Sequence, residues 1–386
     1  MRYTVLIFFV ISFSKTPAQH VIDQTALDSL LRGCKESHSE SLTVLLHGKL
    51  VIDYSLHETQ KPVACYSVLK SIASLAVGKL MADGKITSID QPVSDFYPEW
   101  KQGITKEVTI KHLLNHTSGL EFDERDIDFY KSNDLVRSAL SSKIVDTPGT
   151  KFLYNTKAFL LLLGVIGKAT GIKTDKFIEQ SFFIPLGIKN YKWDYDAAGN
   201  VKELFSSSFE LVKIGQLVLN GGSWKGRQLI SKDWINKLVQ PSQPFVPDNG
   251  FLWWLIPETI VYIVDDALLE EFKKAGIKQD IIDRFKLLKG EYVNVNISPD
   301  KLKTVFGEDW QSFLNKEFYP YFPVRSRRKY GSRIIGYKAE GYLGQYIVIY
   351  PEKKLVAARM VNNTDQYKIE TDEMLDFPAY VYKLVK

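Results

Sequence analysis

The sequence predicts an α+β fold, in which one antiparallel sheet is built from segments near both ends of the chain. Strand-like segments lie at 41–55 and 344–362, whereas most of the chain between them is helical in character. Strands so distant in sequence must pair across the intervening residues, so we expect a helical domain inserted into the sheet. The 386 residues, 45% of them hydrophobic, are enough to fill the core of one large or two modest domains.

The N-terminus has the three-part layout of a secretory signal peptide, which we assign to residues 1–18. Arg2 precedes an apolar run from Val5 to Phe13, and small residues precede a cleavage position after Ala18. The run is too short for a permanent membrane span; a short N-terminal anchor is the alternative. We therefore expect an exported protein, periplasmic or secreted, with no stable membrane span after cleavage.

Residues 20–75 and 205–386 are expected to form a discontinuous α/β domain, and residues 76–204 a helical domain. The α/β domain begins with a helix predicted over 22–32. Two strands then follow, joined by a tight turn at Gly48–Lys49, where glycine suits an antiparallel hairpin.

Later elements are predicted by apolar periodicity and by glycine or proline stops. They are a short helix within 108–120, helices over 159–170 and 206–222, a strand at 250–256, a second hairpin turning at 351–354, and a final helix from about Tyr367.

Residues 257–333 form an insertion between two strands of the α/β domain. The stretch 265–288 is helical in character, and Ser298-Pro299 signals the start of another helix that ends near Lys316. The insertion interrupts the chain just before the strand-like segment at 336–345, so we hypothesise a lid or a partner-binding subdomain. A peripheral insertion with no role in catalysis is the alternative.

Charge and cysteine content narrow the class of protein. The 50 basic and 45 acidic residues give a formal charge of +5 without a concentrated basic stripe, so we expect no nucleic-acid partner. Cys34 and Cys65 permit one disulfide in an exported chain, and two buried thiols are equally compatible with the sequence.

A helix that is apolar on nearly every side is predicted within 64–86, and it carries Ser67 and Lys70. Residues three apart share a helix face, so the lysine can act as, or position, the base that a serine nucleophile needs. Ser67, Ser71, Ser74 and Gly78 form a stripe of small residues that would let another backbone approach closely. The alternative is an N-cap serine followed by a surface lysine.

The segment "YSVLKSIASLAVGKLMADGKI" resembles the first catalytic element of the serine β-lactamase and penicillin-binding-protein-like hydrolases, of the class C type. Five more segments are similar to the family and follow in its order: "VTIKHLLNHTSGL", "PGTKFLYNTKAFLLLLGVIGKATG", "IGQLVLNGGSWKGRQLIS", "GFLWWL" and "KAEGYLGQYIVIYP". The resemblance covers about residues 42 to 362 and implies a β-lactamase/transpeptidase-like fold.

The family's tyrosine motif corresponds to Tyr154-Asn155-Thr156, which places Tyr154 in the general-base position and Thr156 where lactamases carry asparagine. This variant resembles the branch that contains esterases and 6-aminohexanoate-dimer hydrolases.

The third element, within 336–345, has no Lys-Thr-Gly or histidine variant of it. The resemblance implies that this strand supplies backbone amides, and we expect Ala339 to join Ser67 in the oxyanion hole. Tyr337, Gly341 and Trp253 are expected to line or support the pocket. Trp253 and Trp254 are adjacent in a strand and face opposite sides, so one lines the pocket and the other packs in the core.

The resemblance therefore implies a serine hydrolase that forms an acyl-enzyme on Ser67, with a small-molecule ester, amide or peptide as substrate. An esterase or amidase is the first expectation, and a β-lactamase or D-amino-acid peptidase (DD-carboxypeptidase) is the second. A penicillin-binding or sensor protein without turnover is the alternative of another class.

Other kinds of site are less compatible with the sequence. All six histidines lie at or before His116, and no Gly-x-Ser-x-Gly motif is present, which argues against a Ser-His-Asp enzyme. His112 and His116 are better explained as a structural pair beside a turn than as metal ligands. We expect no metal and no organic cofactor.

Overall fold

The computed structural model describes residues 5–6, 21–123, 126–294, 297–317, 327–331, 333–364 and 373–386. The chain forms two compact units, one of Met1–Leu255 with Gly336–Lys386 and the other of Ile256–Ile335. The second unit occupies nearly the same residues as the insertion expected at 257–333. The division of the first unit into helical and α/β domains stays a prediction.

Most of the proposed signal peptide lies outside the described residues. Val5–Leu6 is the described part, and it forms a short edge strand, β1, that pairs with β3 (Lys49–Ser55).

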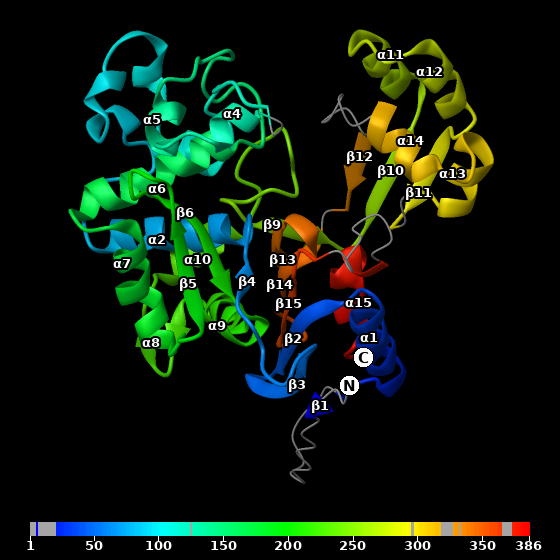
Figure 1. Ribbon diagram of the computed structural model, residues 1–386, viewed down its shortest axis with the longest axis horizontal. Coiled ribbons are helices and arrows are strands. Elements are labelled where there is room, and N and C mark those ends of the chain that lie inside the picture. Colours follow the sequence, from blue (N-terminus) through cyan, green and yellow to red (C-terminus); the bar gives the residue numbers. More distant parts are fainter. Residues whose placement is uncertain are drawn as a thin grey trace. The chain divides into compact units, whose positions relative to one another are not determined.

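The first unit contains an antiparallel sheet built from both ends of the chain, as expected (Figure 1). Within the described part of the chain the sheet has seven strands in the order β1-β3-β2-β15-β14-β13-β9. Besides β1, they are β2 (Ser39–Leu46), β3 (Lys49–Ser55), β9 (Trp254–Pro257), β13 (Ile334–Gly341), β14 (Gln345–Tyr350) and β15 (Leu355–Val361). The α+β class predicted from the sequence is confirmed.

The turn of the first hairpin lies one residue earlier than predicted. His47 and Gly48 occupy its centre with φ of 51° and 72°, so both central residues are left-handed, as a two-residue hairpin turn requires. Lys49 instead begins β3, where it pairs with Leu46.

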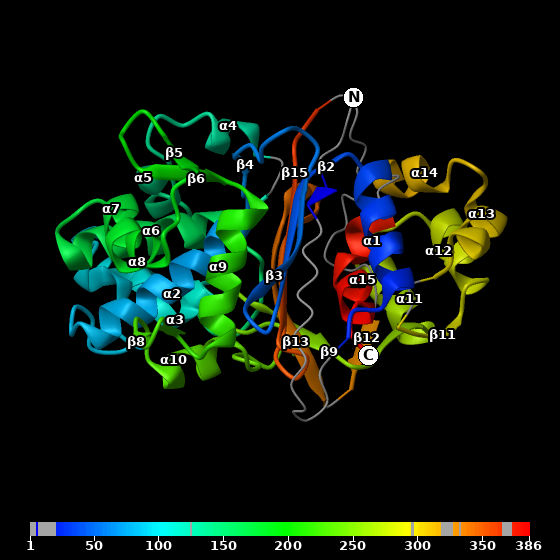
Figure 2. The same ribbon diagram turned by 90° about the horizontal axis from the view of Figure 1, so that it is seen from below.

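Helices cover both faces of this sheet (Figure 2). On one face lie α2 (Val68–Ala82) and α9 (Ser208–Leu219), and on the other lie α1 (Gln24–Glu36) and α15 (Phe377–Lys383). The α-helix predicted from about Tyr367 begins at Phe377, directly after a 3-10 helix over Glu373–Asp376, and 365–372 lie outside the described residues.

The middle of the chain contains more than the helices that were predicted. A hairpin of β5 (Tyr191–Tyr195) and β6 (Val201–Ser206) pairs with β4 (Val63–Ala64), just before α2. The remaining elements are α3 (Ile110–Leu114), α4 (Ile127–Tyr130), α5 (Leu135–Leu140), α6 (Thr156–Thr170), α7 (Thr174–Ile178), α8 (Ile184–Leu186), α10 (Lys232–Leu238), β7 (Ser223–Trp224) and β8 (Arg227–Gln228).

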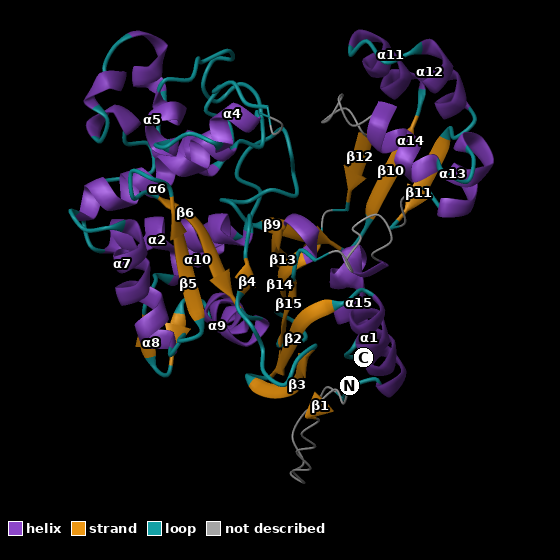
Figure 3. Cartoon of the chain, viewed as in Figure 1, coloured by secondary structure: helices purple, strands orange, loops and turns teal. Residues whose placement is uncertain are grey.

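The second unit combines helices with a small sheet (Figure 3). Strands β10 (Ile260–Val264), β11 (Gly290–Val293) and β12 (Arg327–Tyr330) pair in the order β11-β10-β12 and were not predicted. Its helices are α11 (Asp266–Lys274), α12 (Gln279–Lys286), α13 (Pro299–Phe306) and α14 (Trp310–Glu317). The helix predicted from Ser298 therefore ends at Gly307, and a second one follows it.

The second unit has a hydrophobic core of its own. Buried residues from its strand β10 and its helices pack together, among them Leu268, Phe272, Ile281, Phe285 and Phe306. Such a core is what an independently stable segment needs.

Two further observations concern the whole described chain. Cys34 and Cys65 are both buried and no disulfide joins them, so the disulfide alternative is not met. Across the described residues, every helix is too short or too polar to cross a bilayer.

Candidate active site

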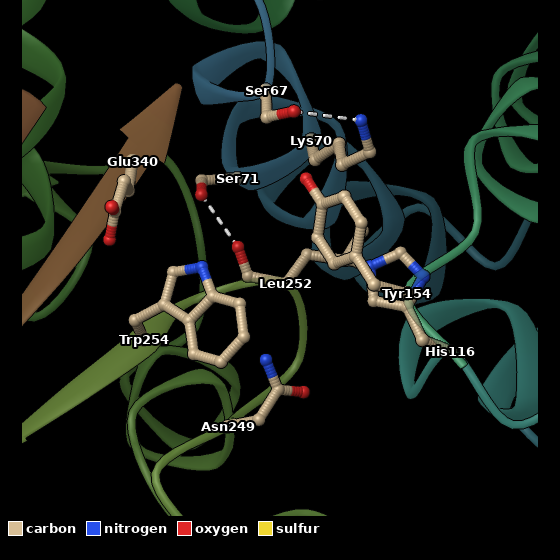
Figure 4. A pocket seen from close by; sticks show the side chains of 9 residues that line it. All are labelled: Ser67, Lys70, Ser71, His116, Tyr154, Asn249, Leu252, Trp254 and Glu340. Atoms are coloured by element: carbon tan, nitrogen blue, oxygen red, sulfur yellow. Dashed lines mark hydrogen bonds between the residues drawn. The ribbon is translucent and has the colours of Figure 1, made fainter. Parts of the chain in front are cut away.

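Ser67 lies in a tight turn at the start of α2, and Lys70 follows one helical turn later. Nζ of Lys70 donates a hydrogen bond to Oγ of Ser67 at 3.0 Å (Figure 4). Lys70 is only 6% exposed, and Nζ lies 5.1 Å and 4.8 Å from the ring centroids of Tyr154 and Phe159. Aromatic faces attract a cation, so these rings help to hold the ammonium beside Ser67.

The alternative of a capping serine with a surface lysine does not fit this geometry. The side chain of Ser67 makes no capping hydrogen bond, and Lys70 is buried. A surface lysine on the same helix is Lys79, which pairs with Asp83 one turn further on.

The stripe of small residues on α2 has two neighbours. Oγ of Ser71 donates to the carbonyl of Leu252 at 2.6 Å, so a backbone does approach closely at this point. Further along, Nε1 of Trp234 donates to the carbonyl of Ser74 at 2.9 Å, and the indole lies directly against Gly78. These contacts fix α2 against the loop that leads into β9 and against the helix that carries Trp234, α10.

Tyr154 precedes the N-terminus of α6, and the next residue, Asn155, caps that helix. Oδ1 of Asn155 accepts from the amide of Ala158 at 3.1 Å, and its Nδ2 donates to the carbonyl of Leu120 at 2.9 Å. This fixes the backbone beside Tyr154, whose hydroxyl points toward Lys70 and Ser67 in Figure 4. The structure thus brings together the three residues predicted to be catalytic.

His116 contacts Tyr154 and the backbone beside it. Its Nδ1 accepts a hydrogen bond from the amide of Asn155 at 3.1 Å, and its ring centroid lies 4.5 Å from that of Tyr154. Burial, and secondly the charge of Lys70, lower the pKa of His116 to about 3. The imidazole is therefore neutral at neutral pH and, with Nδ1 accepting, carries its proton on Nε2.

Strand β13 approaches the Ser67 turn at Gly341 rather than at Ala339. A methyl group placed on Gly341 would lie 2.6 Å from the carbonyl oxygen of Cys65 and 3.3 Å from the amide nitrogen of Ser67. Any side chain would therefore push the strand away from the turn. Ala339, the expected oxyanion donor, is completely buried and pairs with Ile347 of β14.

A small pocket beside Ser67 has a volume of about 10 Å³, which is room for about one water molecule. Nine residues line it: Ser67, Lys70, Ser71, His116, Tyr154, Asn249, Leu252, Trp254 and Glu340 (Figure 4).

Several residues expected at the pocket lie elsewhere. Trp253 is wholly buried and Trp254 lines the pocket, with its ring stacked at 6.4 Å from that of Tyr154. The expectation for Trp253 is therefore corrected, and the two tryptophans do face different surroundings because adjacent residues alternate in direction. Thr156 and Tyr337 are half-buried and do not line the pocket.

Asn249 and Glu340 were not anticipated as pocket residues. Glu340 directly precedes Gly341, and the alternation of side chains along a strand places it on the other face from Ala339 and Gly341. Of the residues expected on this strand, Gly341 contacts the Ser67 turn, whereas Tyr337 and Ala339 do not line the pocket and Glu340 does. Asn249 follows a loop whose position no sequence pattern indicated.

Glu203 is a further residue that sequence reasoning missed, since the β5–β6 hairpin was not predicted. The amide of Cys65 donates to the carbonyl of Leu204 at 2.8 Å, so β6 runs alongside the turn that carries Ser67. Burial raises the pKa of Glu203 to about 7, opposed by hydrogen bonds from backbone amides, first that of Leu204, and by the charge of Lys70. This carboxyl therefore titrates near neutral pH.

The arrangement supplies the parts of nucleophilic acyl transfer. It has a serine hydroxyl, a buried cation hydrogen-bonded to it, and a phenol directed at both. Among the described residues, no group of three or more histidine, cysteine or acidic side chains is placed to hold a metal ion.

Comparison with known proteins agrees with this geometry. Residues 27–204 match the model of the Beta-lactamase family. Protein flp of Staphylococcus aureus is 28% identical over 184 residues, which cover 41% of this chain and 37% of that protein. Esterase EstB of Burkholderia gladioli is 30% identical over 144 residues, covering 32% of this chain and 36% of the esterase. The chain thus spans little more than a third of the length of these two curated relatives.

A solved structure extends the likeness over nearly the whole fold. The penicillin binding protein from Bacillus halodurans superposes with a TM-score of 0.58 at 16% identity, covering 91% of this chain and 98% of that chain. The β-lactamase/transpeptidase-like fold implied by the sequence motifs is therefore confirmed, as is the resemblance to this group of proteins.

Proposed function

We propose that this chain, whose residues 27–204 match the model of the Beta-lactamase family, is a serine hydrolase that forms an acyl-enzyme on Ser67. The observation that carries the proposal is the 3.0 Å hydrogen bond between Nζ of the buried Lys70 and Oγ of Ser67. Burying a lysine cation costs folding free energy, which a hydrogen bond to a serine hydroxyl does little to offset. The burial of Lys70 is therefore better explained by catalysis than by stability.

In the proposed reaction, Tyr154 acts as a phenolate that the positive charge of Lys70 stabilises. It takes the proton of Ser67 while Oγ of Ser67 attacks the carbonyl carbon. The amide of Ser67 and an amide of β13 hold the oxyanion, and the contact at Gly341 favours the amide of that residue over Ala339. The leaving group departs with the proton. Water then attacks the acyl-enzyme, the acid is released and Ser67 regains its proton.

We propose an ester or amide of a small acyl group as the substrate. Similarity to an esterase supports this choice, together with the absence of Lys-Thr-Gly at 336–345, since the corresponding strand here carries Glu340 into the pocket. Turnover of a chromogenic cephalosporin at rates equal to those of simple esters would favour a β-lactamase instead. A peptide ending in two D-residues tests the carboxypeptidase alternative in the same way.

A fluorophosphonate probe tests the nucleophile. We expect it to label the protein on the tryptic peptide that contains Ser67, as identified by mass spectrometry, and not to label the Ser67→Ala variant. Labelling at another serine, or none, would contradict the mechanism. Steady turnover of p-nitrophenyl esters, rather than one burst per molecule, separates an enzyme from a sensor.

We also propose that the protein is exported after cleavage at Ala18, on the strength of the apolar run from Val5 to Phe13. N-terminal sequencing of the protein from its native host would test this. A mature chain that still begins at Met1 would contradict it.

A further inference from the structure

A tight turn forms part of the pocket wall. Its two flanking residues, Asn249 and Trp254, both line the pocket and pair with each other in an isolated bridge. A backbone hydrogen bond of 2.8 Å closes the four residues between them, which we call the 250–253 turn. Leu252, at the centre of this turn, also lines the pocket. The conformation of the turn therefore determines where three residues of the pocket wall lie.

Leu252 has a backbone conformation that suits glycine better than leucine. Its φ is 60°, in the left-handed region, where a Cβ atom lies too close to the backbone. A turn whose second central residue is left-handed normally has glycine or asparagine at that position. Another residue persists there only where the surroundings hold it, and such residues are concentrated at functional sites. The fold must therefore supply a contact that holds Leu252.

That contact is a hydrogen bond from Ser71 of α2 (Figure 4). Oγ of Ser71 donates to the carbonyl of Leu252 at 2.6 Å, and no other residue that the structure describes donates to this carbonyl. Ser71 and Leu252 are 2% and 5% exposed. Without the hydroxyl the carbonyl would be buried and unsatisfied, so the bond stabilises the conformation in which Leu252 directs its carbonyl at α2.

The hydroxyl of Ser71 is not used in the way that is usual for a serine inside a helix. Such a serine commonly donates to the carbonyl three or four residues before it. Ser74, one turn further along α2, does this, since its Oγ donates to the carbonyl of Ser71 at 2.8 Å. Ser71 instead donates to a residue 181 positions away in the sequence. The comparison favours a role for Ser71 outside its own helix.

The 250–253 turn also determines the position of the Trp254 ring. This ring stacks on that of Tyr154, with 6.4 Å between the two centroids. Ser71 directly follows Lys70 in α2, so the helix that carries the buried lysine also holds the turn. The hydrogen bond of Ser71 therefore helps to fix Trp254, and through it Tyr154, relative to Lys70.

We propose that Ser71 is a positioning residue for the acylation of Ser67. Its hydrogen bond holds Leu252 in the left-handed conformation, and the 250–253 turn then keeps Trp254 against Tyr154. Ser71 acts through these residues and takes no part in the proton transfers. The inference rests on the proposed function, because it concerns the same reaction.

The Ser71→Ala variant tests the inference, because it removes the donor without adding volume. We expect kcat/KM for p-nitrophenyl acetate to fall about tenfold, as residues that act through one another allow. The activity is expressed per molecule that a fluorophosphonate probe labels on Ser67. Unfolded protein is then not counted, and a loss of stability alone does not lower the value.

The Leu252→Gly variant supplies the specific rescue. Glycine adopts the left-handed conformation without a side-chain clash, so the turn no longer needs the hydroxyl to hold it. In the Leu252→Gly background, Ser71→Ala should therefore lower kcat/KM by less than about threefold. A merely structural role of Ser71 in α2 predicts the same loss in both backgrounds.

The matched control is Ser74→Ala, which removes an equally buried hydroxyl from the same helix. It should leave kcat/KM per labelled molecule within about twofold of the natural protein. Equal losses for Ser71→Ala in the two backgrounds, or equal effects of Ser71→Ala and Ser74→Ala, would overturn the inference alone. If Ser71→Ala by itself does not fold, a tenfold loss in the Leu252→Gly background still overturns it. Failure of the natural protein to hydrolyse any ester, with no probe on Ser67, would overturn the proposed function instead.

Discussion

At the scale of single residues, the candidate site depends on side chains that are polar and yet buried. Lys70 and His116 are 6% and 1% exposed, and each has a partner that explains its burial. Lys70 donates to Ser67, whereas His116 is held neutral and accepts from the backbone beside Tyr154. Burial in this site therefore serves to orient the reacting groups.

Tyr154→Phe is the sharpest substitution at this scale. Tyr154 is half-buried and its ring packs on His116 and Trp254, so removal of the hydroxyl should leave the fold intact. Loss of a general acid–base group should slow acylation by about 100- to 10,000-fold, measured by the stopped-flow rate of p-nitrophenol release. An unchanged acylation rate, with thermal unfolding also unchanged, would remove Tyr154 from the mechanism.

At the scale of elements, the geometry of the Ser67 turn is set by two strands that bracket it. On one side Leu204 of β6 accepts a hydrogen bond from Cys65, and on the other Gly341 of β13 packs against Cys65 and Ser67. Tyr66, between them, has a left-handed φ of 48°, which non-glycine residues adopt only when the surroundings hold them there. Both strands are therefore needed to present Ser67.

The Gly341→Ala variant tests whether β13 must lie directly against the Ser67 turn. The new methyl would lie 2.6 Å from the carbonyl oxygen of Cys65, so β13 must shift away from Ser67. We expect kcat/KM for ester hydrolysis to fall by at least about 100-fold, as after loss of an oxyanion donor.

The matched control for Gly341→Ala is Gly78→Ala. It creates a closer clash with the ring of Trp234, away from the catalytic serine. The control should lower the thermal unfolding temperature while the folded fraction keeps its kcat/KM. Equal activity losses in the two variants would show a general effect on stability and contradict the role given to β13.

A backbone hydrogen bond within the second unit indicates where a deletion can remove most of this unit. The amide of Glu258 donates to the carbonyl of Arg333 at 2.8 Å, so these two residues are adjacent across a ladder. Replacing residues 259–332 with Asn-Gly should close a two-residue hairpin between β9 and β13.

We expect this deletion variant to fold, because the core that it removes lies within the second unit. Its substrate preference, measured as kcat/KM on p-nitrophenyl esters with different acyl groups, decides whether the insertion is a lid or partner-binding subdomain or a peripheral segment. A changed preference would support a lid or a substrate-binding role, whereas an unchanged one would support a peripheral insertion.

At the scale of the whole molecule, the buried His116 and the half-buried Glu203 make stability depend on pH in opposite directions. The pKa of His116 is lowered to about 3, so protonation of the unfolded chain reduces stability as the pH falls below its ordinary value of 6.5. The pKa of Glu203 is raised to about 7, so the folded chain binds this proton more tightly than the unfolded chain does. Stability therefore declines as the pH rises from 4.5 to 7, where Glu203 must ionise in the fold.

The Glu203→Gln substitution should remove the decline in stability between pH 4.5 and pH 7. Above pH 7 the variant should be more stable than the natural protein by about 2 kcal/mol, allowing for the partial exposure of the carboxyl, and near pH 4.5 the two should be similar. Urea unfolding at pH 5 and pH 8 measures the difference, with Glu99→Gln as the exposed control. A stabilisation that is the same at both pH values would contradict the raised pKa.

Much of this protein was predictable from sequence wherever a local pattern carried the information. The apolar helix with Ser67 and Lys70 and the sheet built from both chain ends follow from periodicity and spacing, whereas the order of the motifs follows from the resemblance to the family. The β5–β6 hairpin was missed although Tyr191–Tyr195 alternates aromatic and charged residues, and the strands of the second unit were missed because their segments lack clear alternation. Glu203 was missed with them.

By itself the sequence determined the α+β class and the three residues expected to be catalytic, because residues close along one helix or within one motif keep their relation in any fold of the family. Tertiary structure alone decided which face of β13 looks into the pocket, which tryptophan lines it, and that Gly341 rather than Ala339 meets the Ser67 turn. These depend on how segments more than 150 residues apart in the chain pack together. Local patterns do not record such packing, since it is set by contacts between whole elements.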